Sequence, residues 1–167
     1  CTITHWLARQ GVDIVCMTAD LGQPDEASFE EIETRMRASG AADFVGLPLQ
    51  ETLAEIGLDV VQAQACYEGR YWNTTGAGRQ AIVQGVVAEM QKRGLTIMSH
   101  GATGRGNDQV RFQIAAAMLD PAIEVYAPWR DPAFLQRFRG RQQMIDYCEQ
   151  HGIPIKATRG KPYSTDA

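Results

Sequence analysis

Apolar residues follow two alternating patterns along the chain. Short, continuous apolar runs such as 13–18 (DIVCMT) are typical of buried strands. Longer segments repeat apolar residues every three or four positions, most clearly between Ile82 and Met90 in the segment 79–93, which is the pattern of a helix with one buried face. This alternation predicts an α/β fold, with a parallel sheet covered by helices on both faces.

Glycines mark the ends of several predicted elements. Gly11 and Gly40 each follow a helical segment and are expected to stop it, and Gly57 is a candidate break within another. An α/β sheet normally opens with a strand, whereas this sequence opens with a helix, so we expect a preceding strand that the sequence lacks. Helices are expected over 2–10, 25–39, 49–66, 79–93, 108–119, 132–138 and 142–151, and strands over 13–18, 43–47, 95–98, 123–126 and 153–156.

Composition narrows the class of protein. The 167 residues suit one domain. A net charge of −4 disfavours nucleic acid as a partner, because phosphates need a basic surface. No apolar run approaches the roughly 18 residues that would cross a membrane. The four cysteines form no CxxC pair and fit no zinc spacing, which favours reduced thiols in a cytoplasmic protein and predicts no protein metal site.

The segment 99–111 (SHGATGRGNDQVR) is the richest in candidate chemistry. It follows a predicted strand and opens a predicted helix, which is where open α/β sheets bind ligands. Its three glycines allow backbone N–H groups to face an anion, and the start of the following helix adds partial positive charge. These features favour a loop that contacts a bound anion.

Polar residues at the start of this helix suit an amino-acid ligand. Asn107 and Asp108 lie four and three positions before Arg111, so the three side chains are neighbours on a helix. Arg111 can bind a carboxylate through two hydrogen bonds, and Asp108 can accept from an ammonium group. A helix cap with a surface ion pair worth less than about 1 kcal/mol explains the same residues equally well.

Three further segments are weaker candidates. The segment 67–79 (YEGRYWNTTGAGR) is either a binding loop or, as spacing alone favours, a packed loop that caps a helix. The segment 161–166 (KPYSTD) reads as a turn. Arginines interleaved with aromatic residues could bind single-stranded nucleic acid, although a solvated, ion-paired face is favoured. These residues are Arg130, Arg137, Arg139, Arg141, Trp129, Phe134 and Phe138.

Six stretches together resemble argininosuccinate synthases: 18–26 (TADLGQPDE), 67–79, 99–112 (SHGATGRGNDQVRF), 126–134 (YAPWRDPAF), 140–155 (GRQQMIDYCEQHGIPI) and 161–166. They occur in the family's order and are spread along nearly the whole chain. The resemblance implies an adenine nucleotide alpha hydrolase-like domain of Rossmann type, also called the ATP pyrophosphatase fold. It also implies ATP-dependent ligation of citrulline and aspartate through a citrullyl-adenylate, with release of AMP and diphosphate.

The resemblance also assigns roles to individual residues. Mg²⁺ would accompany the diphosphate without a protein ligand, and the full-length protein would be a homo-oligomer, a tetramer in the family. The ligand contacts that it implies are Ala19 and Gly101 for ATP, Thr103, Asn107 and Asp108 for aspartate, and Tyr71, Asn107, Arg111 and Ser164 for citrulline.

The sequence departs from the family pattern in two ways. Gly76 stands where many members have a serine that binds citrulline. The family's SGGLDTS-type diphosphate loop, with its preceding strand, and the C-terminal synthetase domain are both lacking, so 1–167 is expected to be an incomplete, inactive nucleotide-binding domain. The alternatives are another enzyme of the ATP pyrophosphatase fold, such as a tRNA-thiolating enzyme, and a non-catalytic module that binds nucleotide or amino acid.

Overall fold

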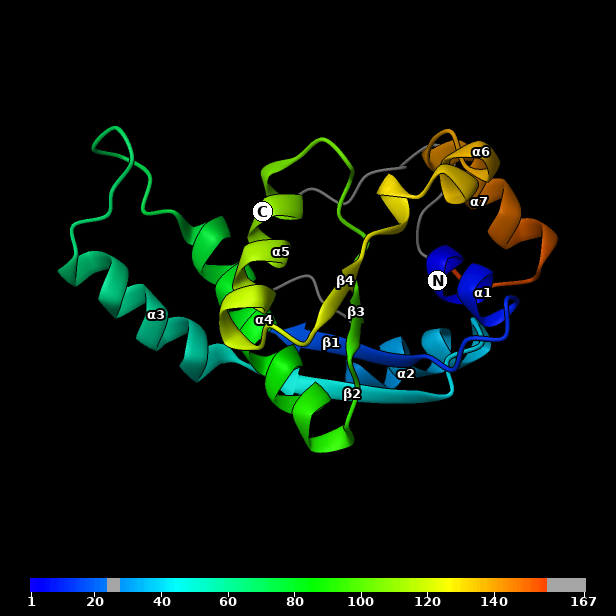
Figure 1. The fold of residues 1–167 in the computed structure, drawn as a ribbon, viewed down its shortest axis with the longest axis horizontal. Coiled ribbons are helices and arrows are strands. Elements are labelled where there is room, and N and C mark those ends of the chain that lie inside the picture. Colours follow the sequence, from blue (N-terminus) through cyan, green and yellow to red (C-terminus); the bar gives the residue numbers. More distant parts are fainter. Residues whose placement is uncertain (24–27, 156–167) are drawn as a thin grey trace. The chain divides into compact units, whose positions relative to one another are not determined.

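Figure 1 shows the computed structural model, which describes residues 1–23 and 28–155. The chain forms two units, one made of Cys1–Thr18, Asp25–Val45 and Arg130–Ala167 and the other of Ala19–Pro24 and Gly46–Trp129. We call them the first and second units. Strands β1 (Val15–Asp20) and β2 (Asp43–Pro48) pair as a two-stranded sheet, and their arrows point the same way in Figure 1.

The described part of the first unit contains the helices α1 (Thr2–Ala8), α2 (Phe29–Ala38), α6 (Pro132–Arg137) and α7 (Arg141–Gln150). Helices α1 and α7 pack together, and the Thr2 hydroxyl lies 3.1 Å from the Cys148 sulfur. Phe134 and Phe138 are the largest fully buried side chains, with ring centroids 4.8 Å apart. The apolar residues of α6 and α7 therefore supply much of this core.

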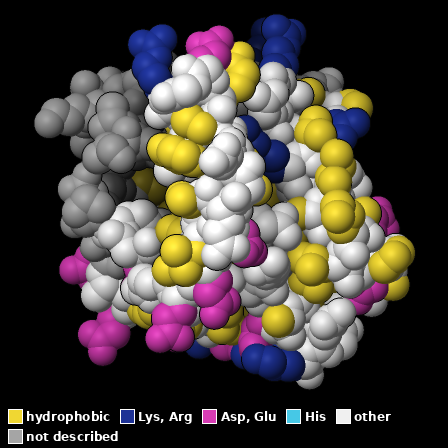
Figure 2. Space-filling view, turned by 90° about the vertical axis from the view of Figure 1, so that its left-hand side faces the viewer, with side chains coloured by type: hydrophobic (Ala, Val, Ile, Leu, Met, Phe, Trp, Pro, Cys, Tyr) yellow, Lys and Arg dark blue, Asp and Glu magenta, His cyan; other side chains and the backbone are white. Residues whose placement is uncertain are grey.

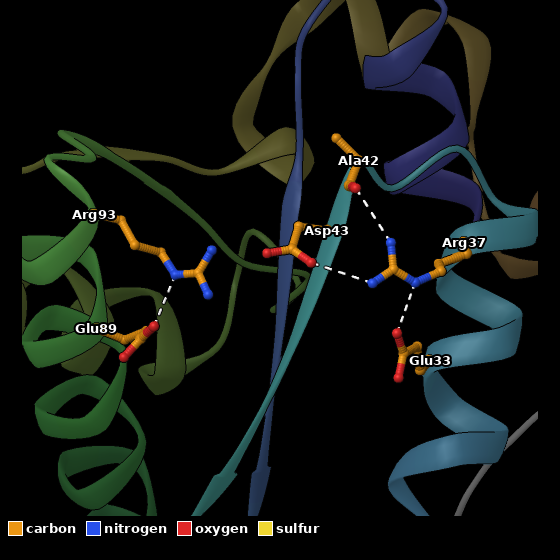
Figure 3. Close-up of polar contacts among 6 residues, drawn as sticks. All are labelled: Glu33, Arg37, Ala42, Asp43, Glu89 and Arg93. Carbon is orange, nitrogen blue, oxygen red and sulfur yellow. Dashed lines mark hydrogen bonds and ion pairs between the residues drawn. The ribbon is translucent and has the colours of Figure 1, made fainter.

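Local signals set the ends of α2. Ser28 caps its start by accepting a hydrogen bond from the Glu31 N–H, and Gly40 follows its end with a φ of 88°, a left-handed conformation that glycine adopts without strain. Arg37 joins the last turn of α2 to the start of β2, because its guanidinium donates to Glu33, to the Ala42 carbonyl and to Asp43 (Figure 3). Residues 25–27 of the predicted helix lie outside the described residues.

The second unit contains helices α3 (Gln50–Gln62), α4 (Thr74–Arg93) and α5 (Asn107–Leu119), with α4 packed against both others. Strands β3 (Ile97–Ser99) and β4 (Glu124–Tyr126) pair in parallel, with Met98 opposite Val125. A short 3₁₀ turn, η1, follows over Pro128–Arg130. The helical stripe predicted for 79–93 is confirmed, because Val83, Val87 and Met90 are buried.

Several apolar side chains of the second unit are exposed. On α3 these include Leu58 and Val61. On α5 they include Val110, Ile114 and Met118, which recur every four residues along one helix face. Figure 2 views the molecule from the side on which α3 lies in Figure 1 and shows hydrophobic side chains exposed among polar ones. None of the described helices combines the length and the apolar character needed to cross a bilayer.

The α/β prediction is confirmed, but three details differ. The described strands pair two and two, as β1–β2 and β3–β4, rather than in one continuous sheet. Helix α3 runs through Gly57 without a break, because glycine at ordinary helical angles weakens a helix by only about 1 kcal/mol. No strand occurs in 153–155, where the Ile153 N–H bonds to the Cys148 carbonyl and so closes the end of α7; residue 156 lies outside the described part.

Two helical glycines of the second unit should respond oppositely to alanine. A Cβ at Gly57 meets nothing within 4 Å, so Gly57→Ala should raise the free energy of unfolding by about 0.5–1 kcal/mol through helix propensity. A Cβ at Gly85 would lie 2.8 Å from both methyl carbons of the buried Leu49, so Gly85→Ala should lower the free energy of unfolding by about 1 kcal/mol or more. Urea denaturation of both variants measures the difference, and equal stabilisation by both would contradict the close packing at Gly85.

Candidate functional site

The loop 100–106 connects β3 to α5 and is held by contacts within the second unit. The ring nitrogen Nδ1 of His100 accepts a hydrogen bond from the Ala102 N–H at 3.3 Å. The side chain of Gln109, only 7% exposed, donates to the Ala102 carbonyl at 2.7 Å. The His100 ring also stacks on Phe112, with centroids 4.6 Å apart. A buried amide and a stacked ring therefore fix the loop against the first turns of α5.

The carboxylate of Asp108 joins two arginines from two helices. Its Oδ1 accepts a hydrogen bond from Arg111 Nη1 at 2.9 Å, within α5. Its Oδ2 accepts one from Arg79 Nε at 3.0 Å, across to α4. All three side chains are part-buried, with the Asp108 side chain 26% exposed. The arrangement is thus more than a surface ion pair, because one carboxylate positions two guanidinium groups.

Opposing effects act on the pKa of Asp108. Burial raises the pKa, whereas the hydrogen bonds and charges of Arg111 and Arg79 lower it, and the lowering effect is larger. Burial lowers the pKa of His100, which the nearby Asp108 charge partly offsets. The buried Nε2 of His100 has no hydrogen-bond partner in the described part of the chain. Asp108 is therefore ionised and His100 neutral at physiological pH.

Tyr71 and Gly76 lie on the Arg111 side of this site. The Tyr71 hydroxyl accepts a hydrogen bond from the Thr75 N–H at 3.0 Å, at the start of α4. Hydrogen bonds from Thr75 and Thr74 lower the pKa of Tyr71, and the charge of Arg111 contributes. A Cβ at Gly76 would lie 3.9 Å from Arg111 Nε, so this glycine borders the guanidinium. The segment 67–79 therefore contributes residues to the site in addition to capping α4.

The remaining predicted residues are placed as follows. Thr103 lies next to the start of α5, because a Cβ at Gly106 would come 3.7 Å from its hydroxyl oxygen. Thr103, Asn107 and Gly101 are all exposed, so a ligand can reach them. Ala19 is half-buried near the end of β1, also in the second unit. Ser164 and the rest of 161–166 lie outside the described residues.

The arrangement supports recognition of amino-acid ligands. Arg111 uses one nitrogen on Asp108 and retains Nε and Nη2 as donors, and Asp108 retains lone pairs on both oxygens. A family model described as the arginosuccinate synthase N-terminal HUP domain matches residues 1–154. The chain belongs to the argininosuccinate synthase family.

Individual argininosuccinate synthases agree with this assignment. The chain is 41% identical to that of Homo sapiens over 165 residues, which are 98% of this chain and 40% of the relative. It is 39% identical to that of Aedes aegypti over 166 residues, 99% of this chain and 40% of the relative. For Thermotoga maritima the identity is 38% over 165 residues, with coverage of 98% and 40%. The chain thus spans about 40% of the length of the curated argininosuccinate synthases that it matches.

Sequence reasoning missed Arg79, Gln109 and His100. Arg79 is the last residue of the segment 67–79. The available signal for it was a cation three residues after Gly76, at the start of a predicted helix. Its partner Asp108 is 29 residues away, so only the packing of α4 on α5 brings the two together. Gln109 and His100 form hydrogen bonds with the backbone of the loop 100–106. The spacing of residues in the sequence does not indicate such contacts.

Two of the three aromatic residues in the arginine and aromatic cluster near 129–141 are buried. Phe134 and Phe138 are 0% and 1% exposed, so their faces are unavailable to a nucleic acid. Arg130 and Arg139 are exposed to solvent. Phe134 and Phe138 of this argininosuccinate synthase segment therefore belong to the core of the first unit.

Proposed function

We propose that the protein joins citrulline to aspartate at the expense of ATP, through a citrullyl-adenylate and with release of AMP and diphosphate. The observation that carries this proposal is the Asp108 carboxylate shared by Arg79 and Arg111, beside Tyr71 and the exposed loop 100–106. Membership of the argininosuccinate synthase family supports the same reaction. Because the chain spans about 40% of its relatives, the activity is proposed for the protein as a whole.

In this proposal Arg111 binds the citrulline carboxylate. With Nη1 held by Asp108, its Nε and Nη2 can donate two parallel hydrogen bonds to a carboxylate. Gly76 adds no side chain beside Nε, which leaves room for the ligand on that side. Tyr71 would line the citrulline site with its hydroxyl, and Asn107 would lie between the two amino acids. Ser164, which the family pattern also assigns to citrulline, lies outside the described residues.

Aspartate would bind at the start of α5. Thr103 and Asn107 offer exposed polar groups there, and Asp108 can accept from the aspartate ammonium with its remaining lone pairs. The backbone of Gly101 and the end of β1 at Ala19 would contact ATP. Both positions lie in the second unit with the amino-acid residues.

The chemistry needs close positioning more than a strong acid or base. The ureido oxygen of citrulline attacks the α-phosphorus of ATP, the bond to diphosphate breaks, and the oxygen becomes part of an adenylate that leaves readily. The aspartate amine then attacks the ureido carbon and AMP departs. Holding the reactants in line supplies much of such an acceleration. Mg²⁺ would arrive with the diphosphate, and no residue of this chain is assigned to it.

The direct test is formation of AMP from ATP by the full-length protein, with and without each amino acid. We expect AMP release that requires both citrulline and aspartate. Citrulline, and not RNA, should also stimulate exchange between ATP and diphosphate. Exchange that responds to RNA instead would favour a thiolating enzyme of the same fold and reject this proposal.

Replacing Arg111 with lysine should weaken citrulline binding by roughly 10- to 100-fold, since lysine cannot form two parallel hydrogen bonds to a carboxylate. Calorimetric titration of citrulline into the variant measures this change. Arg105→Lys is the matched control, because Arg105 is an exposed arginine of the adjoining loop 100–106 and has no assigned ligand contact. Equal affinities in the two variants would remove Arg111 from the citrulline site.

A further inference from the structure

A pocket of about 440 Å³ opens on the first unit, and none of the residues assigned above lines it. It is lined by Trp6, Arg9, Gln10, Arg137, Tyr147 and His151. These residues come from α1 and its following turn, from the end of α6, and from α7 and its C-terminal cap. Figure 1 shows these three helices gathered around the N-terminal end of the chain. All of them belong to the same unit, so the pocket is formed within it.

The aromatic wall of the pocket is held in place by the core. Tyr147 is 6% exposed, its hydroxyl lies 2.8 Å from His5 Nδ1, and its ring packs edge-on against Phe138. The Trp6 ring packs edge-on against Phe134, with centroids 5.1 Å apart. These contacts fix the rings before any ligand arrives, which lowers the entropic cost of binding.

No described carboxylate compensates the charge of the pocket. Neither Arg9 nor Arg137 forms an ion pair with a carboxylate among the described residues, and no acidic residue is among those that line the pocket. The Arg137 guanidinium lies over the Tyr147 ring, 5.8 Å from its centroid, which positions the cation without neutralising it. Burial lowers the pKa of His5, and the neighbouring His151 and Arg9 lower it further.

We propose that this pocket binds a small anion through a phosphoryl group. Two guanidinium groups carry two positive charges, which match a phosphoryl dianion better than a single carboxylate, and arginine forks suit phosphate oxygens. Gln10 and His151 also line the pocket and supply further hydrogen-bonding groups. Because neither arginine has a carboxylate partner among the described residues, an anion can bind both without displacing an ion pair. The phosphoryl group belongs either to free phosphate or to a nucleotide.

The test is an NMR titration of the chain with inorganic phosphate, observed at the indole N–H of Trp6. We expect a saturable shift of this signal, and a loss of affinity of about tenfold or more in Arg9→Gln and in Arg137→Gln. Arg139→Gln is the matched control, since Arg139 is exposed two residues after Arg137 and does not line the pocket. Thermal unfolding of each variant checks that the fold is kept.

Parallel titrations with AMP and adenosine identify the source of the phosphoryl group. Tighter binding of AMP than of phosphate indicates a nucleotide, and equal binding indicates free phosphate. Three outcomes would overturn the proposal: no shift of the Trp6 signal with phosphate, an equal response in the Arg9 and Arg137 variants and the control, or binding of adenosine as tight as that of AMP. Neither the reporter nor the substituted residues are among those proposed to bind citrulline, so failure of this proposal can be told apart from failure of the proposed function.

Discussion

Aspartate should bind about 100-fold more weakly, a loss of roughly 3 kcal/mol, when Asp108 is replaced with alanine. The substitution removes the proposed acceptor for the aspartate ammonium. It also frees Arg79 and Arg111, which both donate to this carboxylate, so the guanidinium proposed for citrulline loses its position. Calorimetric titration with each amino acid measures both effects, and we expect citrulline affinity to fall as well.

Two further variants separate charge from position. Asp108→Asn keeps the shape of the side chain and one acceptor oxygen, so it should retain more citrulline affinity than Asp108→Ala while still weakening aspartate binding. Glu55→Ala removes an exposed carboxylate of α3 in the same unit and should leave both affinities unchanged. If Asp108→Ala bound aspartate as well as Glu55→Ala does, the proposed aspartate site would be wrong.

The same carboxylate makes the stability of the chain depend on acidity. The arginine contacts outweigh burial and hold the pKa of Asp108 below its usual value of 3.8. A carboxyl group with a lowered pKa stabilises the fold fully above its unfolded pKa, and this contribution is lost as the pH falls through the folded value. The stability difference between the wild type and Asp108→Asn should therefore be constant from neutral pH to about 5 and shrink below about 4. Urea denaturation across this range measures it.

Replacing Phe134 with alanine should cost about 3–5 kcal/mol of the free energy of unfolding, the range for deleting a buried aromatic ring. Phe134 is fully buried and packs against the rings of both Trp6 and Phe138. Since a domain is stable by only about 5–15 kcal/mol, the variant should approach the limit of folding. Urea denaturation gives the energy, and the near-ultraviolet circular dichroism of the tryptophans should weaken.

The neighbouring Leu135 provides the control for this prediction. It lies on the same helix but is 40% exposed, so Leu135→Ala should change the free energy of unfolding by less than about 1 kcal/mol. A comparable loss in both variants would mean that α6 itself, and not the buried ring, is being disrupted. A small loss in Phe134→Ala alone would contradict the core described for the first unit.

Whether a segment forms a helix or a strand was largely predictable, because the spacing of apolar residues along the chain follows which side chains are buried. The helix predicted over 79–93 exists, yet α4 begins five residues earlier at Thr74. Its first turn contains Thr, Gly and Ala, without an apolar stripe, and depends on contacts such as the Tyr71 hydroxyl with the Thr75 N–H. Similarly, apolar residues suggested a strand over 153–156, but the Ile153 N–H donates to the Cys148 carbonyl at the end of α7 instead. Where backbone groups find tertiary partners, local pattern is a poor guide.

The contacts of the candidate site that lie within one helix were predictable from the sequence, whereas those between two helices were not. Asp108 and Arg111 lie three positions apart, so their contact follows from helical geometry. Sequence spacing left a cap with a surface ion pair as an equal alternative, and the part-buried bridge to Arg79 favours the functional interpretation. The contact with Arg79 depends on how α4 packs against α5, which no single-sequence pattern encodes.

The shared carboxylate also determines when the two arginines lose their conformational freedom. An arginine side chain carries about 2 kcal/mol of rotamer entropy. Because Asp108 restrains Arg79 and Arg111 through hydrogen bonds of 3.0 and 2.9 Å, much of that entropy is lost as the chain folds. A ligand that reaches Arg111 therefore meets a side chain that is already ordered, and its affinity is not reduced by the full cost of immobilising that side chain.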